Sequence, residues 1–69
     1  MKRYAVVFER AARGYAAFVP DLPGCVATGR TRELVERRIR EAIEQHLAGM
    51  QEARLPIPEP SSWIGAVEV

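Results

Sequence analysis

The stretch Pro20-Asp21-Leu22-Pro23-Gly24-Cys25 constrains the possible folds more than any other part of this chain. Proline presets φ to about −65° at the first central position of a type II turn, and glycine supplies the positive φ that the second position requires. Pro23 and Gly24 therefore predict a tight reversal of the chain, with Leu22 and Cys25 on either side of it.

Two residues after this turn set the further path of the chain. Gly29 provides a second flexible point, and Thr31 is a favourable N-cap for the helical pattern that follows. Their first interpretation is geometric, because no catalytic group is needed to explain them. We therefore predict six structural turn and cap residues, which are Pro20, Asp21, Pro23, Gly24, Gly29 and Thr31.

Three short segments around the turn have the residue pattern of β-strands. Residues 3–9 and 15–19 are rich in β-branched and aromatic types. A hairpin connection over residues 10–14 ends on a glycine, which tolerates most backbone conformations. Residues 25–28 form the third pattern. Because the connections are short, the strands are predicted to form an antiparallel meander.

Residues 31–52 carry the clearest helical periodicity. Their apolar positions fall within an arc of roughly 140°, which is the width of a core-facing helix surface. The opposite face is charged, and the i,i+4 spacing of Glu33–Arg37 and Glu36–Arg40 predicts ion pairs along it. The apolar arc contains Val35, Ile39, Ala42, Ile43, His46, Leu47 and Met50.

The last part of the chain predicts an extended segment and a strand. Proline alternates with other residues over 55–60, which excludes a helix and favours a conformation close to polyproline II. Residues 63–69 then have the pattern of a fourth strand. The predicted order is β-β-β-α-β, an α+β fold with one helix packed on one face of an antiparallel sheet. We expect a single domain over residues 1–69.

The small size of the chain limits its stability as a monomer. A domain of 69 residues buries only about 60% of its unfolded surface. The single cysteine, Cys25, excludes an intramolecular disulfide, and no Cys/His cluster indicates a metal site. Self-association remains, and we expect a homo-oligomer, most simply a two-fold dimer. One free thiol and no export signal favour the cytoplasm, and no segment is long enough to span a membrane.

Two side chains invite a catalytic interpretation. His46 is either a general acid or base or a partly buried histidine in the apolar arc. Cys25 is either a nucleophile, which needs a positioned base, or a small buried hydrophobe. The chain contains no second histidine or cysteine to complete a site, so the structural interpretation is favoured for both. We predict no catalytic residue, cofactor or metal ligand.

Six short motifs occur in a fixed order along the chain. They are Tyr4-x-Val6-x-Phe8-Glu9, Gly14-Tyr15, Val19-Pro20-Asp21-Leu22-Pro23-Gly24-Cys25, Gly29-x-Thr31, Glu41-Ala42-Ile43 and Leu55-Pro56-Ile57-Pro58. Together they strongly resemble the HicB-like antitoxin domain of bacterial and archaeal toxin–antitoxin systems, over nearly the whole chain. The resemblance implies a β-β-β-α-β domain similar to part of ribonuclease H, in agreement with the order of elements above.

The resemblance also implies a partner. HicB-like proteins bind a small mRNA-cleaving toxin of the HicA type and block its active site. Many carry a C-terminal DNA-binding segment, but no second amphipathic helix follows residues 31–50, so DNA binding is not expected. The toxin is then either encoded beside this gene or replaced by another partner. The possible partner-interface residues are Tyr15, Leu22, Trp63, Ile64 and Val67.

A function of another class stays open, namely RNA binding or RNA cleavage on a reduced ribonuclease H-like fold. Such nucleases hold two metal ions with clustered carboxylates. The acids predicted on the sheet and its turns are Glu9, Asp21 and Glu68, which do not form an evident cluster. A binding module is therefore favoured over an enzyme.

The charged helix face and the tryptophan each have two interpretations. The arginines at positions 37, 38 and 40 contact phosphates or belong to a solvated, paired face, and the interleaved glutamates favour the second. Trp63 lies either in the core or at an interface, because tryptophan is common in both.

Overall fold

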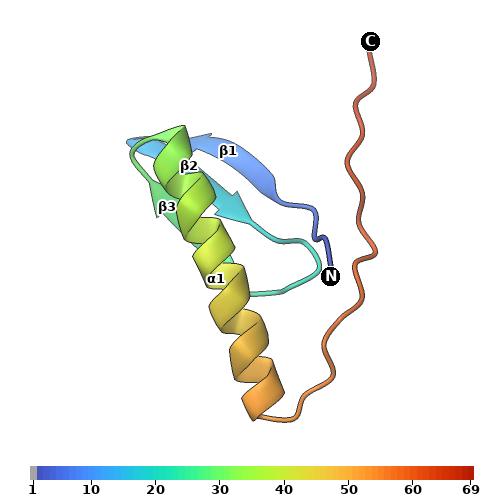
Figure 1. Cartoon of the computed structure of the whole chain (residues 1–69). Helices are drawn as coiled ribbons and strands as arrows, with labels where there is room; N and C mark the ends of the chain where they lie inside the picture. The colour runs from blue at the N-terminus through green and yellow to red at the C-terminus, as the bar shows by residue number, and fades with distance from the viewer. Residues whose placement is uncertain (1) are drawn as a thin grey trace.

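The computed structural model describes residues 2–69 (Figure 1). Its elements are strand β1 (Val7–Ala11), strand β2 (Gly14–Phe18), strand β3 (Val26–Gly29) and helix α1 (Arg32–Glu52). The strands form an antiparallel sheet in the order β1-β2-β3, and α1 covers one face of it. The predicted α+β class, with a meander and one helix on one sheet face, is confirmed.

Two successive turns join β2 to β3. The Leu22 N–H donates to the Val19 carbonyl at 3.1 Å, and the Cys25 N–H donates to the Leu22 carbonyl at 3.0 Å. The Val19 N–H closes the loop by donating to the Cys25 carbonyl at 3.2 Å. Gly24 has φ 84, as the second central position of the predicted turn requires. The double turn points three side chains into the core, those of Val19, Leu22 and Cys25.

Gly14 allows the hairpin to approach the end of β3. Its φ is 138, and a Cβ at this position would clash with the Gly29 carbonyl oxygen and lie 2.9 Å from the Arg30 Cα. A side chain at position 14 would therefore push β2 away from the connection between β3 and α1.

Helix α1 is capped by side-chain and backbone groups at its two ends. The Leu34 N–H donates to Thr31 Oγ1 at 3.1 Å, so Thr31 is the N-cap. At the other end the Leu55 N–H donates to the Met50 carbonyl at 2.9 Å, and Arg54 has φ 57. This is a Schellman motif with arginine where glycine is more common. The helix bounds agree with the predicted 31–52 to within one residue.

The core lies between the first half of α1, the sheet and the double turn. Its buried residues are Ala17, Val19, Leu22, Cys25, Val35 and Ile39. A helix of 21 residues is about 31 Å long, whereas a strand of five residues spans only about 17 Å. The C-terminal half of α1 therefore extends beyond the sheet, as Figure 1 shows.

The prediction of a fourth strand over residues 63–69 is wrong for a single copy of the chain. Residues 63–69 are extended but belong to no sheet in the described structure (Figure 1). An alternating apolar pattern makes a strand only where a neighbouring strand accepts its backbone hydrogen bonds. The first strand is also displaced, because it begins at Val7 rather than at residue 3. Val7 pairs with Phe18, where β2 ends, so earlier residues have no β2 partner.

The predicted ion pairs along α1 are absent as well. Within residues 2–69 the only carboxylate–ammonium or carboxylate–guanidinium contact within 4.0 Å joins Lys2 to Glu59. Exposed pairs on a helix gain little because water screens both charges and each long side chain loses rotamer freedom. Arg38 instead donates to the Thr28 carbonyl at 2.9 Å, which ties α1 to β3.

Replacing Gly24 with valine is expected to lower the free energy of unfolding by about 1–3 kcal/mol, because a β-branched residue is strained at this positive φ. That is a large share of the stability of a small domain. Gly49→Val is the matched control. An added Cβ meets nothing within 4 Å at either glycine, but position 49 is helical and favours valine over glycine. Urea denaturation measures the stability of both variants. Equal unfolding midpoints for Gly24→Val and Gly49→Val would contradict the assigned turn.

Candidate partner-binding surface

The carboxylate of Asp21 holds the segment that follows α1. Its Oδ2 accepts the backbone N–H groups of Ser61 and Ser62, each at 3.0 Å. Its Oδ1 accepts the hydroxyl groups of the same two serines, each at 2.9 Å. We call this set of four hydrogen bonds the serine latch. It joins residues about 40 positions apart in the sequence and attaches the C-terminal segment to the double turn.

The serine latch lowers the pKa of Asp21 from 3.8 to about 2. The backbone N–H of Ser62 is the largest cause, followed by the N–H of Ser61, with smaller contributions from the two hydroxyl groups. Donors aimed at a carboxylate favour its charged form. Both carboxylate oxygens of Asp21 are therefore engaged by the protein itself.

Two contacts just before the latch hold the same segment against the N-terminal residues. The Tyr4 hydroxyl donates to the Pro58 carbonyl at 2.6 Å. Lys2 Nζ lies 2.6 Å from Glu59 Oε1, and this hydrogen bond is the main reason why the pKa of Lys2 is raised. Residues 58–62 are thus held along the N-terminal segment and the double turn.

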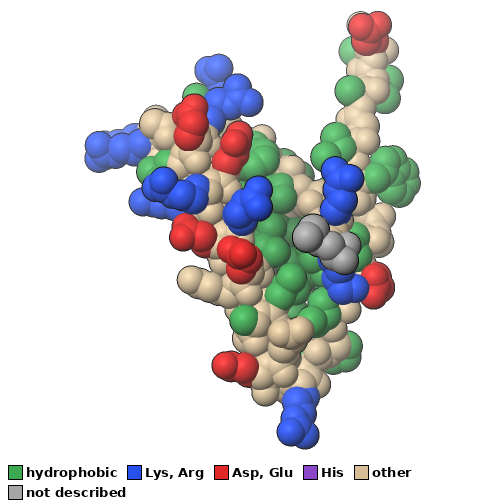
Figure 2. Space-filling model, in the orientation of Figure 1, with side chains coloured by type: hydrophobic (Ala, Val, Ile, Leu, Met, Phe, Trp, Pro, Cys, Tyr) green, Lys and Arg blue, Asp and Glu red, His purple; other side chains and the backbone are tan. Residues whose placement is uncertain are grey.

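Beyond the latch, the residues 63–69 project from the body of the protein, and we call them the tail. Trp63 is 87% exposed and Val67 is 87% exposed, and Ile64 and Val69 are exposed to a similar or greater degree. Figure 2 shows hydrophobic side chains along this projecting segment. Large apolar side chains gathered on a surface mark a site of interaction, because water solvates them poorly.

A groove of about 910 Å³ separates the N-terminal residues and β1 from α1. It exists because α1 contacts β2 and β3 but not β1. Hydrophobic side chains are visible between these elements in Figure 2. The apolar side chains that line the groove are Val6, Phe8, Ile39, Ile43, Leu47, Ala48 and Ile57. The rest of the lining consists of Tyr4, Gln51 and charged residues of both signs, which are Lys2, Arg3, Glu36, Arg40 and Glu44.

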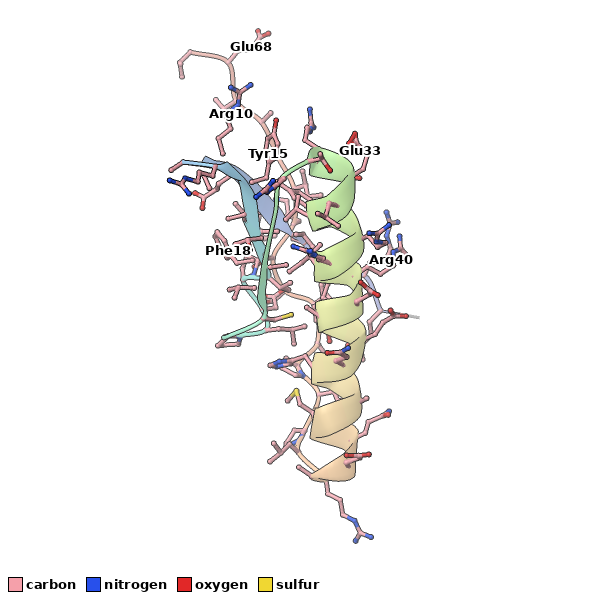
Figure 3. The ribbon with its side chains drawn as sticks, turned by 90° about the vertical axis from the view of Figure 1, so that its left-hand side faces the viewer. Arg10, Tyr15, Phe18, Glu33, Arg40 and Glu68 are labelled. Atoms are coloured by element: carbon pink, nitrogen blue, oxygen red, sulfur yellow. The ribbon has the colours of Figure 1, made fainter. Side chains whose placement is uncertain are left out.

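The face of the sheet opposite α1 carries a second apolar feature, which we call the outer row. Val7 pairs with Phe18, and Phe18 pairs with Val26, so the three side chains lie side by side across the strands. Phe18 points away from α1 in Figure 3, and Val26 is 62% exposed. None of the helices and strands in residues 2–69 covers this face.

The residues predicted for a partner interface divide into three groups. Trp63, Ile64 and Val67 lie together on the exposed tail, and Tyr15 is half-buried beside the core. Leu22 requires a correction, since its exposed fraction is 0%. Its side chain points from the double turn into the core and is therefore buried.

The two candidate catalytic residues differ in their surroundings, because Cys25 is buried in the core and His46 is only partly buried. Burial raises the pKa of the Cys25 thiol, which disfavours the reactive thiolate. His46 is half-buried on α1, in the part that extends beyond the sheet. Among residues 2–69, no three His, Cys, Asp or Glu side chains lie close enough together to hold a metal ion. Nor does the described part of the chain contain a helix both long and apolar enough to cross a membrane.

No sequence pattern indicates the serine latch or the groove. Turn chemistry alone explains an aspartate at position 21, and the adjacent serines at 61 and 62 have no local pattern that points to it. The groove follows from where α1 lies on the sheet, which amphipathic spacing does not specify.

Comparison with known proteins identifies the family. Residues 4–68 match the family model described as "HicB_like antitoxin of bacterial toxin-antitoxin system". The chain belongs to this HicB-like antitoxin family. The match includes the double turn, the serine latch and nearly all of the tail. The expected resemblance is confirmed at the level of the family.

Two relatives support this assignment. A UPF0150 protein of Helicobacter pylori (strain J99) is 39% identical over 64 residues, which cover 91% of this chain and 89% of that protein. An uncharacterized 14.9 kDa protein from the rep-hol intergenic region of Haemophilus phage HP1 is 36% identical over 56 residues. That alignment covers 81% of this chain but 42% of the phage protein, so more than half of the phage protein lies outside the alignment.

The pKa of Asp21 tests the serine latch directly. We expect a carboxyl titration by NMR to give about 2 for the full chain and about 3.8 for a chain that ends after Pro60. The double substitution Ser61→Ala with Ser62→Ala is expected to give an intermediate pKa, because it removes the hydroxyl groups but keeps the stronger N–H donors.

The same shift predicts how stability depends on pH. The pKa of Asp21 is lower in the folded chain, so the latch stabilises the fold fully above 3.8 and loses this effect as the pH falls through about 2. In thermal melts, the chain ending after Pro60 is expected to lack this part of the acid dependence. An Asp21 pKa near 3.8 in the full chain would show that the latch does not form.

Proposed function

We propose that the protein is an antitoxin that neutralises a small mRNA-cleaving toxin of the HicA type by covering it. The observation that carries this proposal is the family match, which spans residues 4–68 and describes an antitoxin of a toxin–antitoxin system. The exposed apolar features of the structure support a function in protein binding. The residues of these apolar features do not have the side-chain chemistry of a catalytic site. The carboxylate of Asp21 is already engaged by hydrogen bonds of the latch.

We assign the toxin contact to the outer row. Its three side chains stand on the backbone of a paired sheet, so a partner meets a surface that is already ordered. Glu9 lies two residues after Val7 and therefore points to the same face of β1. An RNA-cleaving protein needs basic groups that contact phosphates, and a carboxylate beside an apolar row complements such a surface.

Three further properties belong to this proposal. The protein has no enzymatic activity of its own, and it acts in the cytoplasm, where its toxin would encounter mRNA. It is a homodimer, because a small domain with two free sheet edges and an exposed apolar tail gains stability from a second copy. We also propose that the fold resembles part of ribonuclease H.

Co-expression with a small basic protein encoded beside this gene tests the antitoxin function. We expect the wild-type chain to restore growth that the toxin alone arrests, and to co-purify with the toxin. Val26→Glu places a charge in the outer row and is expected to weaken toxin binding at least tenfold in calorimetry. Leu55→Glu is the matched control, because Leu55 is also an exposed apolar residue but lies past the end of α1. Equal binding by both variants would contradict the assigned surface.

The alternative of a nuclease leads to a separate prediction. Purified protein is expected to leave RNA intact in the presence of magnesium or manganese, because its carboxylates do not cluster in residues 2–69. Gel analysis of a labelled RNA after incubation is the measurement. Metal-dependent cleavage that persists through purification and disappears in Asp21→Asn would favour the nuclease over the antitoxin.

A further inference from the structure

We propose that the tail of one copy forms a fourth strand on the free edge of β1 in a second copy, in a reciprocal two-fold exchange. This inference rests on the proposed homodimer and identifies the contact that would hold it together. It accounts for three features at once, namely the exposed apolar tail, the unpaired edge of β1 and the open groove.

The acceptor is the free edge of β1. The sheet order is β1-β2-β3, so among residues 2–69 β1 has a strand neighbour on one side only. The helix-side face of β1 is also uncovered, because α1 lies over β2 and β3. Phe8 lines the groove and is 48% exposed there. A strand added at this edge would hydrogen-bond to β1 and place alternate side chains over the groove.

The tail has one entirely apolar face. Alternation in an extended strand puts Trp63, Gly65, Val67 and Val69 on one face. Glu68 lies on the other face, with Ile64 and Ala66. An entirely apolar face can therefore enter the groove while the only charged side chain of the tail stays outside. The seven tail residues span about 23 Å and the five residues of β1 about 17 Å, so the tail is long enough to pair along the whole of β1.

The path of the chain before the tail indicates that a second copy supplies the strand. The chain passes along its own groove before the latch, since Ile57 lines the groove and the Pro58 carbonyl accepts a hydrogen bond from Tyr4, which also lines it. The serine latch then holds residues 61 and 62 on the double turn, and the tail continues away from the body of the protein (Figure 1). The latch thus presents the tail outward, where a second copy can accept it. Reciprocal exchange buries both tails and both grooves in one two-fold contact.

Light scattering of the isolated protein is the first test. We expect a mass of about twice 7.7 kDa at micromolar concentration, and 7.7 kDa after deletion of residues 63–69. A monomeric full chain would overturn the homodimer and the exchange together. A dimer that survives the deletion would overturn the exchange alone. A full chain that is monomeric until toxin is added would assign the tail to the toxin and would also overturn the exchange.

Two charged variants test the contact from its two sides. Val67→Glu in the tail and Phe8→Glu in the groove are each expected to give a monomer, while Leu55→Glu stays dimeric. Circular dichroism checks that every variant keeps its helix. A dimeric Val67→Glu or Phe8→Glu variant that retains the helix would contradict the contact.

Mixing the two monomeric variants distinguishes exchange from other contacts. The mixture pairs an intact groove from the Val67→Glu chain with an intact tail from the Phe8→Glu chain, so one of the two reciprocal contacts is restored. We expect dimers in the mixture that are absent from either variant alone. If the tail packed on its own chain or against the other tail, mixing would restore nothing, and that result would overturn the proposal.

Discussion

The double turn from Val19 to Cys25 is the constraint on which the rest of the structure depends. Three backbone hydrogen bonds close it, and they turn Val19, Leu22 and Cys25 into the core between the sheet and α1. The same closure leaves the carboxylate of Asp21 on the outside, where it accepts four hydrogen bonds from two serines. One short loop therefore completes the core on its inner side and directs the C-terminal segment on its outer side.

Local chemistry explains why part of this structure could be predicted from the sequence. The type II turn depends on Pro23 and Gly24 themselves, and the helix start depends on Thr31 and a backbone N–H three residues later. The serine latch has no such local signal, because Asp21 meets serines about 40 residues further along the chain. Neither serine nor aspartate indicates a partner at that separation until the fold brings them together.

The tail shows the limit of a period-two pattern. Residues 63–69 have the composition and alternation of a strand, yet a strand exists only as one member of a pair. Whether a partner strand is available depends on the direction that the chain takes after the serine latch at Asp21. That direction is a property of the whole fold. The early part of the predicted first strand failed for the same reason, since residues before Val7 extend past the end of β2. Strand patterns thus predict the capacity to pair, and the tertiary structure decides the partner.

The groove and the outer row lie on opposite faces of the sheet, so two partners could occupy them at the same time. The groove lies on the α1 side of β1, whereas the outer row occupies the opposite face of the same sheet. A second copy seated along the groove and the β1 edge would leave Phe18 and Val26 open to a toxin. Because a ligand that binds only the folded state stabilises it, self-association would also favour the ordered sheet that presents the outer row. In this arrangement, dimer formation and toxin binding support each other through the stability of one small core.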